Sequence, residues 1–286
     1  MKCFVMLCVL AITYAKHVVK DKEEKKPVCE GIKVHGKIHE EKVLINGINR
    51  PYQLSYYKKN STDHILYFSY NVGLQNESTF MIGYAEAGYP VPKPVTTVKN
   101  GFATALNHKE EIIYLGGSEG IYVRNLTEPA ESAKTHHLIP NHDIWDIFYK
   151  HSLYFIAFPS RRLYKVDSHL ETEKDEHIHE KLYQFVIDGD GDTFISNKTG
   201  LYMIRKDSHH RIHMKGATVF RAFEVNRKGV AYFCGQNEVY VADKEKHSLV
   251  EIATIKNIFG LTFDEDDNMI YSDPHQIVKL LPKDCK

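Results

Sequence analysis

Short apolar runs of four or five residues, bounded by Gly, Asn, Asp and Ser, recur along most of this chain. They predict hairpin-connected β-strands, because the bounding residues favour turns and the Val, Ile, Tyr and Phe between them suit a pleated surface. One run in each unit is marked by an aromatic residue: Tyr67, Tyr114, Tyr154, Phe194, Tyr232 and Tyr271. The markers lie 47, 40, 40, 38 and 39 residues apart. A period of about 40 residues with several strands per unit is typical of a β-propeller, so we expect an all-β, six-bladed propeller.

The fourth unit shows the expected blade. Its strands are predicted over 183–187, 193–196, 201–205 and 211–214, with turns between them. Both faces of a blade are buried against neighbouring blades, which explains why the apolar runs are continuous rather than alternating. The innermost strands are expected to begin near Tyr52, Phe102, Ile144, Tyr183, Phe220 and Phe259.

The last unit ends one strand short of four. Lys42–Ile45 precedes the first innermost strand, and we expect it to supply the missing outer strand and close the ring. Closure matters because an open propeller leaves strand edges unpaired. Cys29 and Cys285 flank the closing strands, so a disulfide is predicted between them, stabilising the fold by about 5 kcal/mol in the chain-entropy model. Cys234 ends a predicted strand and is expected to be a buried thiol.

The N-terminal residues indicate secretion. Lys2 precedes a short apolar run, and Thr13 and Ala15 suit cleavage after Ala15, so residues 1–15 are interpreted as a signal peptide. A signal anchor is the alternative, but the run is shorter than a bilayer span. Residues 16–28 are charged and are expected to be a mobile segment, and residues 29–286 to form the propeller.

Glycosylation sequons support an extracellular location. They occur at Asn60, Asn76, Asn125 and Asn197, all in predicted turns. The 37 basic and 37 acidic residues are interspersed, so no basic field exists to attract nucleic acid. We expect a secreted monomeric glycoprotein without a nucleic-acid or membrane partner.

Two patterns suggest metal ligands, and a structural interpretation is preferred for each. Asp188, Asp190 and Asp192 resemble the start of a calcium loop, but Thr193 and Thr199 stand where an EF-hand has its Gly and its bidentate acid. A turn is therefore predicted. Histidines cluster at 136–137, 177–179 and 209–213, and His-x-His on a strand can hold a metal. These segments map to outer strands and their turns, so surface histidines are favoured, and no metal, cofactor or catalytic residue is expected.

The starts of the innermost strands are the predicted binding site. In a propeller they share one face with the turns between second and third strands, close to the axis. Aromatic rings there can stack on a flat ligand and arginine can pair with a carboxylate. The candidate ligand-binding residues are Arg50, Tyr52, Phe102, Trp145, Gln184, Arg221 and Phe259. For any single ring, packing between blades is the alternative.

Several segments, taken in order, resemble the insect ommochrome-binding proteins, which are secreted haemolymph proteins of moths and butterflies. They are Asn46–Gln53, Leu66–Tyr70, Ile113–Tyr122, Asp143–Tyr149 and Ile270–Asp273. The resemblance extends from Cys29 to Cys285. It implies that the protein carries an ommochrome pigment such as xanthommatin, a tryptophan-derived phenoxazinone, without a covalent bond.

Two other functions stay open beside this carrier. One is a metal-dependent lactonase or esterase similar to regucalcin, which needs a divalent cation held at the axis by acids and amides. Asn100, Asp143, Asp146 and Asp273 are its candidate ligands. The other is a propeller that binds a protein on one face. We expect a small-molecule binder rather than an enzyme.

Overall fold

The computed structural model describes residues 29–74 and 79–285. Within these residues all regular structure is β-strand, arranged as four sheets of four strands and one sheet of nine. No helix in this part of the chain is long and apolar enough to cross a bilayer. The predicted signal peptide (1–15), the predicted mobile segment (16–28) and the sequon at Asn76 lie outside the described residues.

The four-stranded sheets follow one another along the chain, each as an antiparallel meander. The first consists of β3 (Tyr52–Lys58), β4 (His64–Asn71), β5 (Phe80–Glu86) and β6 (Tyr89–Pro94). The second consists of β7 (Ala103–Asn107), β8 (Ile112–Gly117), β9 (Gly120–Asn125) and β10 (Thr135–Pro140). The third consists of β11 (Asp143–Lys150), β12 (Ser152–Phe158), β13 (Leu163–Val166) and β14 (Thr172–Lys174). The fourth consists of β15 (Gln184–Ile187), β16 (Thr193–Asn197), β17 (Gly200–Ile204) and β18 (Arg211–Gly216).

The nine-stranded sheet contains the rest of the strands. In chain order they are β1 (Ile32–Val34), β2 (Lys37–Asn46), β19 (Ala222–Val225), β20 (Ala231–Cys234), β21 (Glu238–Asp243), β22 (Ser248–Thr254), β23 (Gly260–Phe263), β24 (Met269–Ser272) and β25 (Gln276–Pro282). Their order across the sheet is β19-β20-β21-β22-β1-β2-β25-β24-β23. Two four-stranded units, β19–β22 and β23–β25 with β2, are therefore joined through β1.

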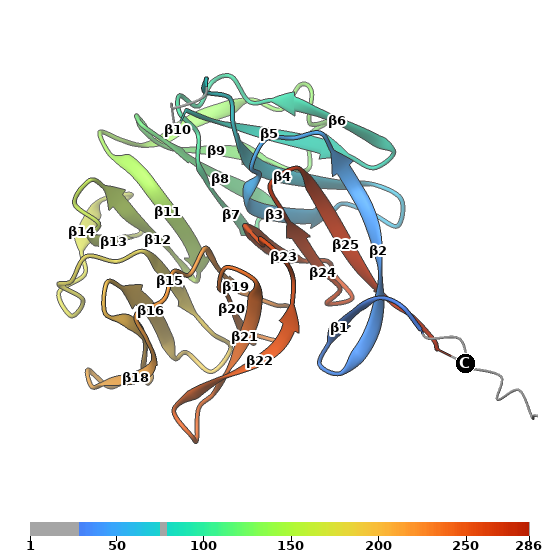
Figure 1. The fold of residues 1–286 in the computed structure, drawn as a ribbon. Coiled ribbons are helices and arrows are strands. Elements are labelled where there is room, and N and C mark those ends of the chain that lie inside the picture. Colours follow the sequence, from blue (N-terminus) through green and yellow to red (C-terminus); the bar gives the residue numbers. More distant parts are fainter. Residues whose placement is uncertain (1–28, 75–78, 286) are drawn as a thin grey trace, which may run out of the picture.

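The innermost strands form a closed ring, which makes the fold a β-propeller. β3 contacts β7, β7 contacts β11, and the series continues through β15, β19 and β23 back to β3 (Figure 1). Each innermost strand begins within two residues of its predicted start. Aromatic and aliphatic side chains fill the space between neighbouring sheets, for example Tyr67 against Ile113 and Phe194 against Phe233.

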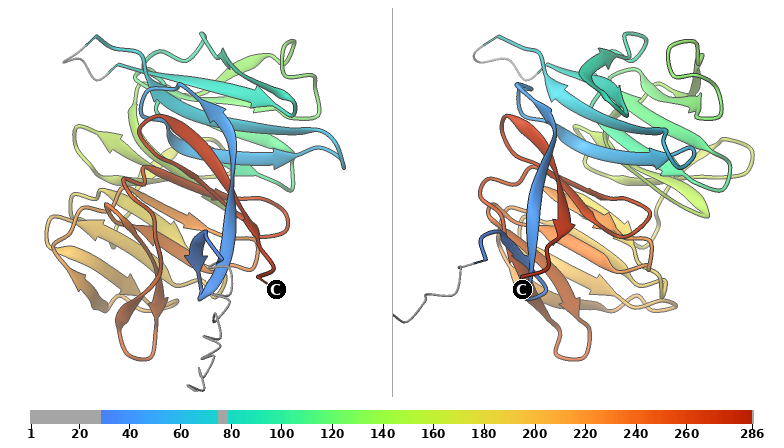
Figure 2. Two further views of the ribbon diagram at one scale, coloured as in Figure 1. Left: turned by 45° about the vertical axis from the view of Figure 1, so that its right-hand side comes forward. Right: turned by 90° about the vertical axis from the view of Figure 1, so that its right-hand side faces the viewer.

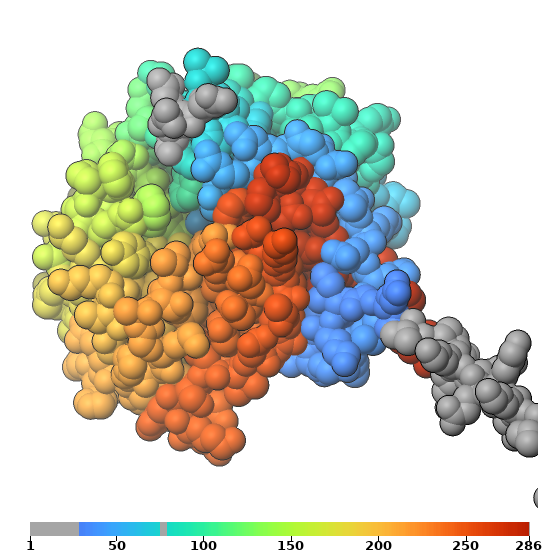
Figure 3. Space-filling view, in the orientation of Figure 1, coloured from blue at the N-terminus to red at the C-terminus, as the bar shows by residue number. Residues whose placement is uncertain are grey.

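The N-terminal segment closes the ring as predicted. Lys42 pairs with Lys279 and Ile45 with Ile277, so β2 is the outer neighbour of β25. Figure 2 shows the two strands running side by side, and Figure 3 shows that the N-terminal and C-terminal segments are adjacent on the surface. The sequence analysis missed β1, which pairs with β2 and, through Val34 and Ala253, with β22.

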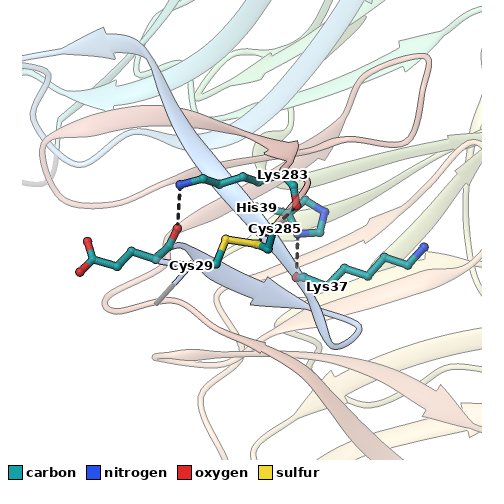
Figure 4. The surroundings of a disulfide bond; sticks show 6 residues. Cys29, Lys37, His39, Lys283 and Cys285 are labelled. Atoms are coloured by element: carbon teal, nitrogen blue, oxygen red, sulfur yellow. Dashed lines mark hydrogen bonds between the residues drawn. A yellow bond between two sulfur atoms is a disulfide. The ribbon is translucent and has the colours of Figure 1, made fainter. Parts of the chain in front are cut away.

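A disulfide fixes this closure. Cys29 and Cys285 are bonded, with their Cα atoms 5.7 Å apart, which confirms the predicted pairing. Close to the bond, the Lys283 Nζ donates a hydrogen bond to the Glu30 carbonyl oxygen (Figure 4). Cys234 is a free, fully buried thiol, also as predicted.

Candidate functional site

A cavity of about 930 Å³ opens where the innermost strands begin. Adjacent strands are antiparallel, so the links that enter each innermost strand lie at the same end as the turns between second and third strands. We call this the start end, and the opposite end the far end. Both kinds of link contribute to the wall, including residues 217–221 before β19, and Asn197 at the end of β16 with Lys198 in the turn to β17. We call this space the aromatic cavity.

Five of the seven candidate residues line the aromatic cavity. They are Tyr52, Phe102, Trp145, Gln184 and Arg221. The rings form a continuous wall, since the centroid of Phe102 lies 5.7 Å from that of Tyr52 and 5.5 Å from that of Trp145. The structure therefore gathers most of the predicted set at one opening.

Local irregularities of the strands aim these rings. The register of β11 against β12 shifts between Ile144 and Asp146, which makes Trp145 the extra residue of a β-bulge. Its indole Nε1 donates a hydrogen bond of 2.9 Å to the Tyr183 carbonyl oxygen, which fixes the ring. A second register shift follows Tyr52 in β3. Bulges commonly re-aim side chains beside functional sites.

Two candidates do not line the cavity. The ring of Phe259 stacks on Tyr52 at a centroid distance of 4.8 Å and lies under the Arg221 guanidinium, so it supports the wall from behind. Arg50 lies in the turn before β3, with a φ of 47°, and its backbone N–H donates to the Pro274 carbonyl oxygen. Arg50 is therefore part of this turn, and Tyr52, two residues further on, lines the cavity.

The sequence analysis missed several residues of the wall. The larger ones are Phe80, Phe158, Arg161, Tyr183, Val219 and Phe220. Phe158, Tyr183 and Val219 are 45%, 43% and 72% exposed, which is unusual for large apolar side chains gathered at one opening. Tyr183 and Phe220 belong to strand starts already named in the sequence, whereas Phe158 is the last residue of β12 and Arg161 lies in the turn that follows.

The polar groups of the wall differ in their hydrogen bonds to the rest of the protein and in how burial affects their charge. The Arg221 Nη1 donates to the Ile258 carbonyl oxygen at 3.1 Å. The Gln184 Oε1 accepts from the Phe223 backbone N–H at 3.3 Å. Burial lowers the pKa of Arg161, and burial raises the pKa of Asp143, which also lines the cavity.

A smaller cavity of about 330 Å³ lies along the inner strands toward the far end. Asp146 and Glu224 line it, together with Gln53 and Thr104. Burial raises the pKa of Asp146 to about 7 and that of Glu224 to about 8. Each carboxylate accepts a hydrogen bond from the backbone N–H of the next residue, Ile147 and Val225 respectively. This space, the axial cavity, thus holds two carboxyl groups that favour the protonated state.

The far end carries the predicted Asp-Gly turn, between β15 and β16. Asp188, Asp190 and Asp192 bring their carboxylates within 4.8 Å of one another. The ammonium of Lys244 contacts all three, at 2.5, 2.8 and 2.7 Å. A lysine from the β21–β22 turn therefore occupies the position that a cation would take in such a cluster.

Comparison with known proteins places these features in a family. No family model matches the chain. A protein named ommochrome-binding protein, from Manduca sexta, is 30% identical over 256 residues, which cover 88% of this chain and 90% of that protein. This chain belongs to the ommochrome-binding protein family.

Solved structures similar to this ommochrome-binding family member share its fold. A gluconolactonase from Xanthomonas campestris matches with a TM-score of 0.62 and 9% identity, covering 90% of this chain and 96% of that one. Virginiamycin B lyase from Staphylococcus aureus matches with a TM-score of 0.53 and 12% identity, over 86% of this chain and 99% of that one. A chain of a nidogen–laminin complex gives 0.54 and 13%, over 80% and 95%. At these identities the likeness concerns the fold alone.

The candidate ligands of the lactonase alternative are dispersed in this family member. Asn100 and Asp143 line the aromatic cavity, whereas Asp146 lines the axial cavity. The Asn100 Oδ1 accepts from the Phe80 backbone N–H at 2.8 Å. Asp273 caps the β24–β25 turn, accepting from the backbone N–H of His275 and of Gln276.

The sequons within the described residues lie at both ends of the molecule. Asn60 follows β3 and Asn125 ends β9, which puts them at the far end, while Asn197 borders the aromatic cavity. The Oδ1 of Asn197 accepts from the Thr199 N–H and hydroxyl, at 2.9 and 2.6 Å. Asn60 and Asn125 make the same bonds to Thr62 and Thr127. Asn60 lies in a turn, as predicted, whereas Asn125 and Asn197 are the last residues of β9 and β16, each directly before a turn.

Proposed function

We propose that this protein binds a small aromatic pigment of the ommochrome class, without a covalent bond, in the aromatic cavity. The observation that carries the proposal is the wall of adjoining rings, Tyr52–Phe102–Trp145, around a space of about 930 Å³. Binding sites for small molecules are typically concavities of about 300–1,000 Å³, mainly apolar, with a few polar groups that orient the ligand. The family supports the ligand class, since the relative from Manduca sexta is named for ommochrome binding.

A titration with xanthommatin tests this function. Trp145 is the only tryptophan of the chain and lies in the wall, so its fluorescence should be quenched as the pigment binds. Replacing it in Trp145→Leu removes a stacking surface and should weaken binding roughly three- to tenfold, measured by pigment absorbance. The matched control is Tyr89→Leu, an aromatic residue of β6 that is 68% exposed and lies outside the cavity. Equal affinities for wild type and Trp145→Leu would place the pigment elsewhere.

The lactonase alternative rests on the fold, which this chain shares with a gluconolactonase. Metal analysis of the purified protein, combined with a lactone hydrolysis assay, separates the two functions. Stoichiometric divalent metal with turnover supports the enzyme, and bound chromophore without turnover supports the carrier. We favour the carrier because Asp146 and Asp273, two of the four candidate metal ligands, lie outside the aromatic cavity.

We also propose where the protein acts and in what form. The Cys29–Cys285 disulfide suits an oxidising, extracellular compartment, and haemolymph is the location that fits a soluble pigment carrier. We infer six blades, counting β19–β22 and β23–β25 with β2 as separate blades of the nine-stranded sheet. The protein would act as a monomer that is glycosylated at its sequons.

A further inference from the structure

Arg161 holds an unusual position in the aromatic cavity. It lies in the turn between β12 and β13, with a φ of 58° in the left-handed region. Its N–H donates to the Ala157 carbonyl oxygen at 2.7 Å, and its own carbonyl accepts from the Leu182 N–H at 2.9 Å. The backbone is thus fixed from both sides, which directs the side chain along the cavity wall.

The guanidinium of Arg161 is surrounded by aromatic rings. Its Cζ lies 3.3 Å from the centroid of the Trp145 ring, 5.6 Å from that of Phe158 and 5.5 Å from that of Tyr183. A guanidinium can stack on an aromatic face and still offer N–H donors at its edge. The ring of Trp145 is itself held by its bond to the Tyr183 carbonyl oxygen, so the two groups form a rigid pair.

This cation forms no salt bridge among the residues that the structure describes, and the carboxyl group of the buried Asp146 acts on it only from a longer distance. Arg211 forms a salt bridge to Glu180 at 2.8 Å, but no carboxylate of residues 29–74 or 79–285 lies within 4.0 Å of Arg161. Its Nη1 is buried and has no hydrogen-bond partner in this part of the chain. A partly desolvated cation without a salt bridge is stabilised when an anion arrives to pair with it. Arg221, by contrast, is already bonded to the Ile258 carbonyl oxygen.

We propose that Arg161 is the residue that recognises a carboxylate of the ligand, and that the site selects flat aromatic carboxylic acids over neutral compounds of the same shape. The proposal rests on the function proposed above and specifies which chemical class the cavity accepts. The planar fork of a guanidinium matches a carboxylate with two parallel hydrogen bonds. The ring system of such a ligand would lie along the adjoining aromatic wall while its carboxylate reaches the guanidinium edge.

A matched pair of probes tests this selectivity. Cinnabarinic acid is a tricyclic phenoxazinone with two carboxylates, and aminophenoxazinone has the same ring without them. Both are titrated into wild type, Arg161→Gln, Arg161→Lys and the control Arg162→Gln. Arg162 lies in the same turn but faces a different surface depression, so it matches the change in charge. Circular dichroism and thermal melts of each variant establish that it is folded.

The expected result is a change in selectivity. Arg161→Gln should weaken cinnabarinic acid roughly tenfold or more and aminophenoxazinone by less than about threefold. Arg161→Lys should restore part of the loss, because it keeps the charge and loses the fork, and Arg162→Gln should bind both probes like wild type. Equal losses for both probes would mean that Arg161 only supports Trp145, and would overturn the inference while leaving the proposed function intact. If wild type binds neither probe nor xanthommatin, the proposed function fails and this inference with it.

Discussion

The two ends of the inner strands differ in how their charged side chains are paired, although both are built from turns of the same repeat. At the far end, charges are matched within the protein: Lys244 contacts three aspartates, and Lys279 contacts Asp264 at 2.5 Å. At the start end, rings adjoin one another around open space and the Arg161 guanidinium forms no salt bridge to a described residue. The carboxylates of the far end are thus paired within the protein, whereas the proposed binding site lies at the start end. Turns of the same repeat can thus stabilise one face through ion pairs and leave a cavity open at the other.

The largest effect should follow from removing the cation at the far end. In Lys244→Met, Asp188 and Asp192, which are 4% and 8% exposed in their side chains, would lose their counter-charge. Breaking a largely buried ion pair from one side costs about 3–5 kcal/mol. The free energy of unfolding from urea denaturation should fall by about that amount, and calcium should restore part of it by binding the freed carboxylates.

The control for this change is Lys246→Met in the same turn. The side chain of Lys246 is 81% exposed and pairs with Asp243 at 3.1 Å, so its loss should change stability by less than about 1 kcal/mol. If Lys244→Met is as stable as Lys246→Met, the ion pairs of Lys244 do not stabilise the fold. The proposed difference between the two ends would then be wrong.

The axial cavity between the two ends should make stability depend on pH. Burial raises the pKa of Asp146 to about 7 and of Glu224 to about 8, so the folded protein binds these protons more tightly than the unfolded chain. Their stabilising effect is complete below about pH 4 and is lost as pH rises through 7 to 8. In the double variant Asp146→Asn/Glu224→Gln this loss should disappear. Between pH 5 and pH 8 the free energy of unfolding of wild type should therefore fall by about 6 kcal/mol more than that of the double variant.

Urea denaturation across this pH range measures the difference. Glu176→Gln, on an exposed loop, removes one carboxylate at the surface and serves as the control. Parallel pH profiles for wild type and the double variant would show that the two carboxyl groups are solvated rather than enclosed.

The sequence predicts the ring better than it predicts the details of either end. Regular spacing located the innermost strands, and the missing fourth strand identified Lys42–Ile45, because strand pairing follows from the repeat itself. β1 was missed since it joins two four-stranded units of the nine-stranded sheet and belongs to neither repeat unit. The innermost strands and the closing strand could be predicted because the repeat, and the one strand missing from its last unit, are visible in a single sequence.

Side-chain contacts made across turns could not be predicted from the sequence. Lys244 is far in sequence from the aspartates that it neutralises, and it comes from a turn of the next unit. Arg161 follows a strand rather than preceding one, so a prediction based on strand starts names Arg50 and Arg221 instead. Both cases require knowing how far a long side chain reaches across a turn, which the pattern of apolar residues does not encode.

The smallest expected effect is that of glycans on the rate of pigment association, which should differ between the two ends. A glycan on Asn197 would stand at the rim of the aromatic cavity, while glycans on Asn60 and Asn125 would lie at the far end. Thr199→Ala removes the first sequon and keeps the asparagine, and Thr127→Ala does the same for Asn125. In protein from insect cells, Thr199→Ala should speed xanthommatin association about two- to threefold, because a rim glycan hinders entry without contacting the bound ring. Stopped-flow quenching of Trp145 measures this rate, and Thr127→Ala should match wild type. Equal acceleration in both variants would show that the glycans act on the whole molecule, and that the position of Asn197 at the cavity has no special effect.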